Sequence, residues 1–343
     1  MKAESAIGPG LANPVYPDLV QRLVTTTAVP DDDIRFVLAV CSAYAYGDAD
    51  TVATMMDRLG LTRNRCRMIS EYVDALFLTS TAYLIQSHDG RVSILCYRGT
   101  PPTSLITWMT DFEVESVTIP VSSASGTGFG KVHAGFYRNV RSTRFRIVEL
   151  LDRAIAGKSV LDPEESPEDE PPESGLEALY LVGHSLGGTS AALLAALLRA
   201  EPTRYGSILE RLRAVYTYGS MMIGDPAFAD ACDTDPFLRE NVIRYVYAND
   251  VVPQFPPRAS GSFKHFGPEY RYAPAGEKGH WRQGKSRKQL RGLLWLLTAP
   301  LALVARVFTW ARRIRFRASL SDHLPQYYLD ALTPDALRSE FGD

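Results

Sequence analysis

Hydrophobic residues recur along the chain at two spacings, and each spacing predicts a different kind of element. Apolar positions three and four residues apart predict helices, and these cover Asp31–Tyr46, Asp50–Leu59, Gly135–Ala156, Thr189–Arg199, Pro226–Cys232 and Tyr327–Leu332. Short apolar runs between turn residues predict strands, and these cover Leu76–Ile85, Val92–Tyr97, Leu179–Val182, Ala214–Tyr218 and Val242–Ala248. The turn His88-Asp89-Gly90 predicts that the first two strands form a hairpin.

The order of these elements predicts the fold class. Strands that alternate with helices are typical of an α/β domain with a mainly parallel sheet flanked by helices. We therefore expect one domain over residues 31–343, preceded by an irregular, Pro-rich lead-in over residues 1–30. Within the domain, residues 162–173 contain seven acidic residues and four prolines. Such a segment cannot bury apolar area, so we expect a solvated loop that serves only as a spacer.

The composition is that of an ordinary globular protein. Of the 343 residues, 45% are hydrophobic and 22% are charged, which excludes a disordered or polytopic membrane protein. The four cysteines are scattered without CxxC spacing, so neither a zinc site nor a disulfide framework is expected. The first thirty residues lack the apolar core of a secretory signal, which favours a cytoplasmic location.

The formal net charge of −2 hides a strong asymmetry. Between Lys278 and Arg317 the chain has eleven Lys and Arg and no Asp or Glu, whereas the remainder has 26 basic against 39 acidic residues, a net charge of −13. We expect a basic and apolar insertion over residues 284–318. Inside it, residues 293–305 are thirteen uncharged positions, fewer than the ~20 apolar residues that a membrane span needs.

Basic clusters flank this apolar stretch on both sides, and Trp295 and Trp310 lie near its two ends. This combination predicts an interfacial segment that lies on anionic lipid. Its expected membrane-facing residues are Trp295, Trp310, Arg312, Arg313, Arg315 and Arg317. A buried helix with solvated basic ends is the alternative, and no base-reading motif indicates nucleic acid as a partner.

Gly183-His184-Ser185-Leu186-Gly187 matches the nucleophile-elbow pattern G-x-S-x-G. The strand predicted before it and the small-residue helix predicted after it are the context that this turn requires. We expect a sharp, strained turn that exposes the hydroxyl of Ser185, with glycines on both sides because a Cβ there would collide with the neighbouring strand and helix. Ser185 is therefore the candidate nucleophile.

A nucleophilic serine needs a histidine base and an acid that orients the base. In this type of site they follow in the order Ser, Asp or Glu, His. The histidines after Ser185 are His265, His280 and His323, and the candidate acids at strand ends are Asp225 and Asp250. Asp250 follows the clearest strand, and His323 lies in a polar turn before a predicted helix, so we favour these two. A surface-loop position without function is the alternative for each.

Five further sequence blocks occur in order along the chain. They are Tyr97-Arg98-Gly99-Thr100 with Trp108 and Asp111 behind it, Val132-His133-Ala134-Gly135-Phe136, Tyr216-Thr217-Tyr218-Gly219-Ser220 continuing to Asp225 and Phe228, Asn249-Asp250-Val251-Val252-Pro253 ending in Pro256-Pro257, and residues 263–270. Together with the elbow they resemble the class 3 (fungal-type) lipase family of α/β-hydrolases, from about Ala39 to Leu332. Ser220-Met221-Met222 departs from the family pattern, and residues 284–318 match none of its blocks.

The resemblance implies an α/β-hydrolase fold and a division of roles among the candidates. It implies Ser185 as nucleophile, Asp250 as orienting acid and His323 as base. It also implies an oxyanion hole formed by the backbone N–H of Leu186 and by the N–H and hydroxyl of Thr100. Asp225 matches a structural position of the family, and His133, His184 and His265 match positions outside the triad.

An apolar face at helical spacing lies beside Thr100. Its members are Leu105, Trp108, Met109 and Phe112. The family has its lid at this position, so the resemblance implies a short helix that covers the site, binds substrate and turns its apolar face onto lipid. A helix packed into the core is the alternative.

These features predict a serine lipase or carboxylesterase that hydrolyses an acylglycerol-like lipid ester through an acyl-enzyme, bound peripherally to a membrane on its cytoplasmic side. The mechanism uses side chains and water, so no cofactor or metal is expected. A phospholipase A1 or lysophospholipase, or an acyltransferase with the same triad, is the alternative. A non-catalytic membrane-binding module is disfavoured, because such a module has no reason to keep every catalytic part.

Overall fold

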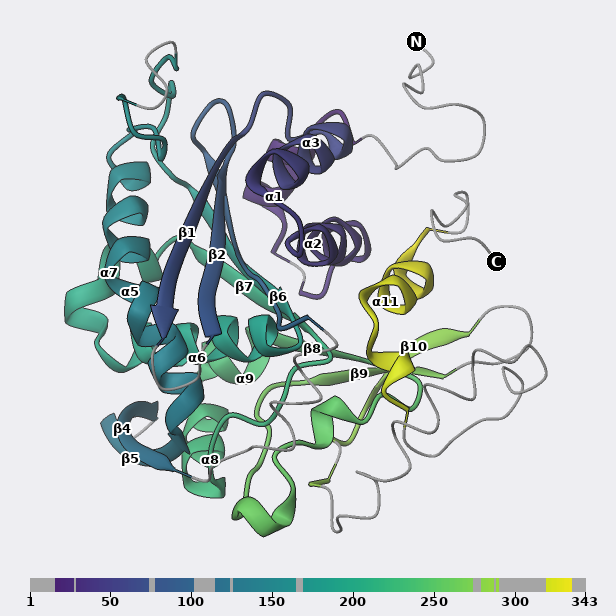
Figure 1. The fold of residues 1–343 in the computed structure, drawn as a ribbon. Coiled ribbons are helices and arrows are strands. Elements are labelled where there is room, and N and C mark those ends of the chain that lie inside the picture. Colours follow the sequence, from purple (N-terminus) through teal and green to yellow (C-terminus); the bar gives the residue numbers. More distant parts are fainter. Residues whose placement is uncertain are drawn as a thin grey trace.

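The computed structural model describes residues 16–27, 29–73, 78–101, 115–123, 126–164, 169–273, 279–286, 288–289 and 319–334. Eight strands form one sheet in the order β1-β2-β3-β6-β7-β8-β9-β10 (Figure 1). Their bounds are β1 Arg65–Val73, β2 Leu78–Gln86, β3 Val92–Tyr97, β6 Ala178–His184, β7 Leu212–Tyr218, β8 Val242–Tyr247, β9 Glu269–Ala273 and β10 His280–Gly284. A separate hairpin pairs β4 (Ser116–Ser123) with β5 (Gly126–His133).

The centre of the sheet is parallel. Strands β3, β6, β7, β8 and β9 run in the same direction, so their carboxyl ends meet at one edge of the sheet. Antiparallel strands extend both sides, with β2 and β1 beyond β3 and β10 beyond β9. The mainly parallel α/β fold predicted from the order of the elements is therefore confirmed.

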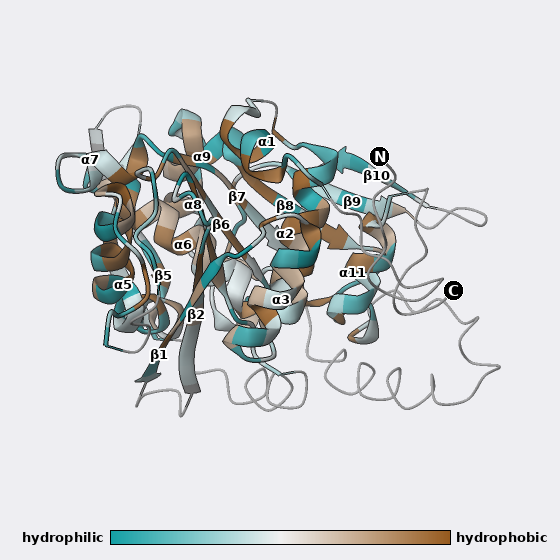
Figure 2. Ribbon diagram, turned by 90° about the horizontal axis from the view of Figure 1, so that it is seen from above, coloured by the Kyte–Doolittle hydropathy of each residue, from teal (hydrophilic) through white to brown (hydrophobic). Residues whose placement is uncertain are grey.

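Helices cover both faces of this sheet (Figure 1). One face carries α1 (Leu19–Thr25), α2 (Asp32–Tyr44), α3 (Ala49–Leu59) and α11 (Pro325–Leu332), and the other carries α5 (Ala134–Ile155), α6 (Leu186–Ala200), α7 (Pro202–Leu209), α8 (Pro226–Thr234) and α9 (Pro236–Asn241). Every residue of β3 and β6 is buried, since both faces of these strands are covered. Figure 2 accordingly shows hydrophobic residues on the central strands.

The elements predicted from spacing are present, with ends that differ by a few residues. The N-terminal lead-in differs from expectation, because helix α1 lies within residues 1–30, which were expected to be irregular. Leu19 and Leu23 are four residues apart and both are buried, so one apolar stripe of a single short helix packs against the domain. The backbone N–H of Tyr16 also donates to the carbonyl of Leu59 at 3.0 Å, which ties this segment to the end of α3.

The acidic segment 162–173 is more than the solvated spacer that its composition predicts. Arg65, which is buried, donates to both carboxylate oxygens of Asp169, at 2.7 and 3.0 Å, and to the carbonyl of Glu170. Asp162 pairs with Arg67 at 2.6 Å and with Arg146 at 3.4 Å. The composition alone did not indicate these ion pairs, because buried and half-buried arginines recruit acidic side chains without any burial of apolar area.

Within the described residues, no helix combines the length and the apolar character that a bilayer crossing requires. The apolar stretch 293–305 lies outside the described residues. The assignment of residues 31–343 to a single domain stays a prediction.

Candidate active site

Ser185 stands at the turn between β6 and α6, at the carboxyl edge of the parallel strands. Its backbone has φ +58° and ψ −128°, a conformation that is strained for any residue with a Cβ. The backbone N–H of Ser185 donates to the carbonyl of Tyr218 at 2.8 Å, which fixes the turn to the neighbouring strand β7. The sharp elbow expected from the sequence is therefore present.

The glycines of the elbow are required for close packing. A Cβ on Gly183 would lie 2.3 Å from the carbonyl carbon of Gly187, and a Cβ on Gly187 would lie 2.1 Å from the carbonyl oxygen of Tyr97. Both distances are far below van der Waals contact. The glycines thus allow α6 to begin directly against β6 and the end of β3.

The structure brings Asp250 and His323 together beside this elbow. Nδ1 of His323 lies 2.8 Å from Oδ2 of Asp250, and both side chains are buried. The approach depends on Ser319, which forms a parallel bridge with Asp250; its N–H donates to the carbonyl of Asn249 at 2.9 Å. A segment from far downstream in the sequence is thereby attached to the end of β8.

Asp250 is held by further donors. Its Oδ1 accepts from the backbone N–H of Val252 at 2.9 Å, and its Oδ2 accepts from the hydroxyl of Tyr328 at 2.5 Å. Gly219 adjoins the pair with φ +63°, and a Cβ there would lie 2.8 Å from both Asp250 Oδ2 and His323 Nδ1. Neither Tyr328 nor Gly219 was predicted as a site residue; the only available signals were the Gly at a strand end and the Tyr on the helix after His323.

Two reactive atoms of the site have no hydrogen-bond partner within the described part of the chain. They are Oγ of Ser185 and Nε2 of His323, both fully buried. Because Nδ1 of His323 faces a carboxylate, which only accepts, the neutral ring carries its proton on Nδ1 and leaves Nε2 as an acceptor. Seven other buried side-chain atoms in the described part of the chain also lack a partner, so the strained elbow at Ser185 and the carboxylate on the other ring nitrogen of His323 are what distinguish these two atoms as candidates for a reaction.

His184 supports the backbone of His323. Its Nε2 lies 2.7 Å from the carbonyl oxygen of His323, so this nitrogen carries the proton, and its Nδ1 accepts from the hydroxyl of Tyr46 at 2.8 Å. Burial, followed by the proximity of His323, holds the pKa of His184 well below its ordinary value. His184 is therefore a neutral structural link, in agreement with its expected place outside the triad.

Thr100 and Leu186 lie at the same sheet edge. Leu186 is the first residue of α6, where the N–H has no earlier carbonyl of the helix to bind. Thr100 is buried three residues beyond Tyr97, whose register partner on β6 is Gly183. A Cβ on Gly99 would lie 2.6 Å from the carbonyl oxygen of His184, so the chain passes directly against the elbow before it reaches Thr100.

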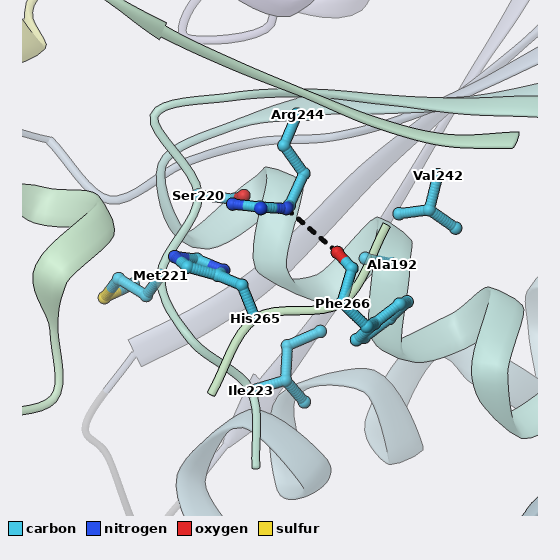
Figure 3. A pocket seen from close by; sticks show the side chains of 8 residues that line it. All are labelled: Ala192, Ser220, Met221, Ile223, Val242, Arg244, His265 and Phe266. Atoms are coloured by element: carbon cyan, nitrogen blue, oxygen red, sulfur yellow. Dashed lines mark hydrogen bonds between the residues drawn. The ribbon is translucent and has the colours of Figure 1, made fainter. Parts of the chain in front are cut away.

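A small cavity of about 10 Å³ is lined by Ala192 of α6 and by Ser220 and Met221, which follow β7 (Figure 3). Its polar wall is Arg244, which donates to the carbonyl of Phe266 at 2.9 Å and to Glu269 at 3.1 Å. Figure 3 shows the guanidinium of Arg244 beside the ring of His265. Burial and this positive charge lower the pKa of His265 to about 3.

The remaining candidates have structural positions or lie outside the described residues. Asp225 caps α8 by accepting from the N–H of Phe228 at 2.8 Å, and His133 caps α5 by accepting from Gly135 at 3.1 Å. His265 is bonded to the carbonyl of Pro253, and His280 is exposed on β10. The lid candidates Leu105, Trp108, Met109 and Phe112, and the membrane candidates Trp295, Trp310, Arg312, Arg313, Arg315 and Arg317, are outside the described residues.

Among the described residues, no three His, Cys, Asp or Glu side chains are grouped so that they could hold a metal ion. The four cysteines are free, and three of them are buried.

Comparison with known proteins agrees with this geometry. A family model described as Lipase (class 3) matches residues 94–260. "Triacylglycerol lipase OBL1" of Arabidopsis thaliana is 27% identical over 254 residues, which cover 66% of this chain and 47% of the relative. "Secreted mono- and diacylglycerol lipase A" of Penicillium cyclopium is 25% identical over 261 residues, which cover 74% of this chain and 73% of the relative. The chain spans less than half the length of the Arabidopsis relative and of its Ricinus communis counterpart.

Solved structures are similar in fold. The lipase from Rhizopus microsporus var. chinensis superposes with a TM-score of 0.53 at 18% identity, over 94% of this chain and 96% of that one. A mutant form of MDLA from Penicillium cyclopium gives a TM-score of 0.53 at 20% identity, over 79% of this chain and 95% of that one. These likenesses show that the predicted α/β-hydrolase fold is present.

Proposed function

We propose that this chain is a class 3 lipase, that is, a serine hydrolase that cleaves a carboxylic ester of an acylglycerol-like lipid. The observation that carries the proposal is the pair of buried, unpartnered atoms, Oγ of Ser185 and Nε2 of His323, with Asp250 on the other ring nitrogen. The relatives support the substrate class, since their printed names are those of lipases for tri-, di- and monoacylglycerols.

In the proposed mechanism, Oγ of Ser185 attacks the ester carbonyl while Nε2 of His323 accepts the hydroxyl proton. The imidazolium then gives this proton to the leaving alkoxide, and an acyl-enzyme remains on Ser185. Water, deprotonated by Nε2 of His323, attacks the acyl-enzyme and releases the fatty acid. Asp250 holds the imidazole in the required tautomer and stabilises the imidazolium, and Tyr328 and Val252 hold Asp250 in place.

The developing oxyanion is placed in this proposal between the backbone N–H of Leu186 and the N–H and hydroxyl of Thr100. Each preorganised donor of this kind stabilises the tetrahedral intermediate by about 3 kcal/mol. Helix α6 begins at Leu186, and the positive end of its dipole favours the negative charge of an oxyanion bound at this N–H.

A covalent probe and a substrate panel test this function together. A fluorophosphonate is expected to label the wild-type protein at Ser185 and to leave Ser185→Ala unlabelled, and the same substitution is expected to lower ester hydrolysis by about 10⁶. The panel contains acylglycerols, phospholipids and p-nitrophenyl esters, each with and without an alcohol acceptor. Labelling that survives in Ser185→Ala contradicts the nucleophile, and products formed only with the acceptor indicate an acyltransferase.

We also propose that the lid residues and the basic segment 284–318 bring the enzyme to an anionic membrane surface. The charge asymmetry supports this, since each Lys or Arg near such a surface contributes about 1 kcal/mol, within a Debye length of about 8 Å. Anionic lipids face the cytoplasm, and four free cysteines are typical of a reducing compartment, so the proposed location is peripheral on the cytoplasmic leaflet.

This location is tested by reversal of charge. Replacing Arg312, Arg313, Arg315 and Arg317 by Glu is expected to abolish sedimentation with anionic vesicles and to leave hydrolysis of a soluble short-chain ester unchanged. Wild-type sedimentation is expected to weaken steeply as salt rises. Equal binding to neutral and anionic vesicles would contradict the electrostatic attachment.

A further inference from the structure

A second cavity, of about 280 Å³, opens on the surface between two segments that are far apart in sequence. One wall is the loop that carries Arg258, Ser262 and Lys264, and the other is the short segment that carries Ser286, Lys288 and Gln289. This cavity is separate from Ser185. It is connected to the candidate site through its inner wall, because His265 lines it and binds the carbonyl of Pro253 at 2.7 Å, three residues after Asp250.

Gln289 holds the two walls together. Its Nε2 donates to the carbonyls of Pro256 and Gly261 at 3.0 and 2.7 Å, and its Oε1 accepts from the N–H of Phe263 at 3.1 Å. At the other end, Arg244 donates to Oγ of Ser286 at 2.6 Å. Because both ends are bonded to the domain, the cavity exists before any ligand arrives, and its shape costs no ordering on binding.

The described lining of this cavity carries a net positive charge. Arg258, Lys264 and Lys288 line it, and its described lining contains no Asp or Glu. Lys264 is shared with Asp230 and also lies 3.9 Å from Asp233. Arg258 and Lys288, by contrast, have no ion-pair partner within the described ranges, and both side chains are exposed.

Uncharged donors complete the lining. Oγ of Ser286 already accepts a hydrogen bond from Arg244, so its O–H is left to donate to a ligand. Ser262 adds a second hydroxyl from the opposite wall. The side chain of His265 is neutral, and its N–H is committed to Pro253, so the cations are the source of the cavity's charge.

We propose that this cavity binds the phosphoryl group of a phosphate monoester. Three cations and two hydroxyl donors match a dianion with three acceptor oxygens, whereas a single carboxylate would leave most of these donors unused. The volume lies just under the smallest sites that take drug-sized molecules, as expected for a site that takes one polar group. The group belongs either to a soluble phosphate ester or to the head group of phosphatidic acid, and experiment distinguishes these sources.

The first test measures binding, so its outcome does not depend on whether Ser185 hydrolyses esters. Calorimetric titration of the full chain with inorganic phosphate is expected to show binding that chloride at equal ionic strength does not reproduce. Arg258→Gln combined with Lys288→Gln is expected to weaken this binding by about 10- to 30-fold, at about fivefold per cation. Absence of phosphate binding to the wild-type protein overturns the proposal.

A matched control separates a site from a diffuse positive field. Arg282→Gln combined with Lys285→Gln removes the same charges from exposed positions on the neighbouring stretch, outside the cavity lining, and is expected to change phosphate affinity less than twofold. Gln289→Ala keeps every cation but breaks the tie between the walls, and it is expected to weaken binding at least fivefold. Equal loss in the control pair, or full affinity in Gln289→Ala, overturns the site.

Vesicles and a soluble ester identify the source of the phosphoryl group. The probes are phosphatidylcholine vesicles with a minor fraction of phosphatidic acid, vesicles with the same fraction of phosphatidylglycerol instead, and glycerol 3-phosphate. Cavity-dependent preference for phosphatidic acid over phosphatidylglycerol supports a lipid head group, and cavity-dependent binding of glycerol 3-phosphate without such a preference supports a soluble ester. Binding of all three that is insensitive to Arg258→Gln with Lys288→Gln overturns the proposal.

Discussion

Two buried polar clusters lie on and after strand β8, and they differ in how completely their hydrogen bonds are made. Around Arg244, the guanidinium donates to Glu269, to Ser286 and to the carbonyls of Phe266 and Gly267. Around His323, one ring nitrogen is bonded to Asp250 while the other has no partner within the described residues, and the same is true of Oγ of Ser185.

The difference separates a structural cluster from a reactive one. A buried charge that is fully bonded holds strands and loops in register, and removing one partner leaves an uncompensated charge. A buried nucleophile and a buried base that lack hydrogen-bond partners destabilise the fold. They are useful only when a bound substrate provides the missing partners. We therefore expect substitutions in the two clusters to affect different measured quantities.

The largest expected effect is on catalysis, at Asp250. Asp250→Asn leaves the shape of the site intact but favours the wrong tautomer of His323, so kcat for a soluble ester is expected to fall by about 10⁴. The matched variant is Asp225→Asn, since Asp225 caps α8 and also accepts from the N–H of Lys131 at 3.2 Å. Here we expect a loss of about 1 kcal/mol in unfolding free energy and little change in kcat.

Steady-state kinetics and thermal melts of the two variants decide between these assignments. If Asp225→Asn is the slower enzyme while its melting temperature matches the wild type, the orienting acid has been assigned to the wrong residue.

The next effect is on stability, at Arg244. Arg244→Met removes one of the two arginines that pair with the buried Glu269 and leaves Arg271 as the other, so the unfolding free energy is expected to fall by about 1.5–3 kcal/mol. The rate per folded molecule should change little. The double variant Arg244→Met with Glu269→Leu removes both charges and should recover part of the loss. Urea unfolding measures the change, and a stable single variant that has lost its activity would place Arg244 in the reactive cluster instead.

The smallest effect is a dependence of stability on pH, at His265. Its pKa is about 3 in the folded protein and about 6.5 when unfolded, so between these values only the unfolded chain binds the proton. The stability contribution is therefore complete above pH 6.5 and is lost as the pH falls, by up to about 1.4 kcal/mol per unit. His184 has a lowered pKa as well and acts in the same direction.

His265→Gln isolates this contribution, because Gln keeps an N–H for the carbonyl of Pro253 but does not titrate. From pH 6.5 to pH 4.5, the wild type is expected to lose about 2 kcal/mol more unfolding free energy than the variant. Parallel stability curves for the two proteins would show that His265 is not buried as a neutral group.

Short-range sequence patterns were sufficient to predict many of the helices and strands. The elbow was predictable because strand, glycines and small-residue helix are adjacent in sequence, and the structure has the strained Ser185 and the close glycines at the expected places. Strands β1, β4, β5, β9 and β10 and the short helices α7 and α9 were missed. Strands β1 and β10 lie at the two edges of the sheet and pair on one side only, and β4 and β5 pair with each other outside it, so long-range pairing rather than local pattern defines them.

Long-range pairing accounts for what could not be predicted. The acidic segment was interpreted as a spacer, because its composition does not show that Arg65, from much earlier in the chain, is buried beside it. The roles of Tyr46, Gly219 and Tyr328 could likewise not be predicted, since they arise from contacts with His184, His323 and Asp250 that span much of the chain.

The sequence by itself determined the alternation of strands and helices, the elbow at Ser185, the order of the three polar residues and the concentration of positive charge after Lys278. These follow from local spacing and composition, which act between neighbours in the chain. Only the tertiary structure decided that Asp250 lies 2.8 Å from His323, that the reactive atoms are buried without partners, and that Arg258, Lys264 and Lys288 line one cavity. These contacts join segments that are far apart in the sequence. The bridge between Asp250 and Ser319 is an example, since it forms only when the chain is folded.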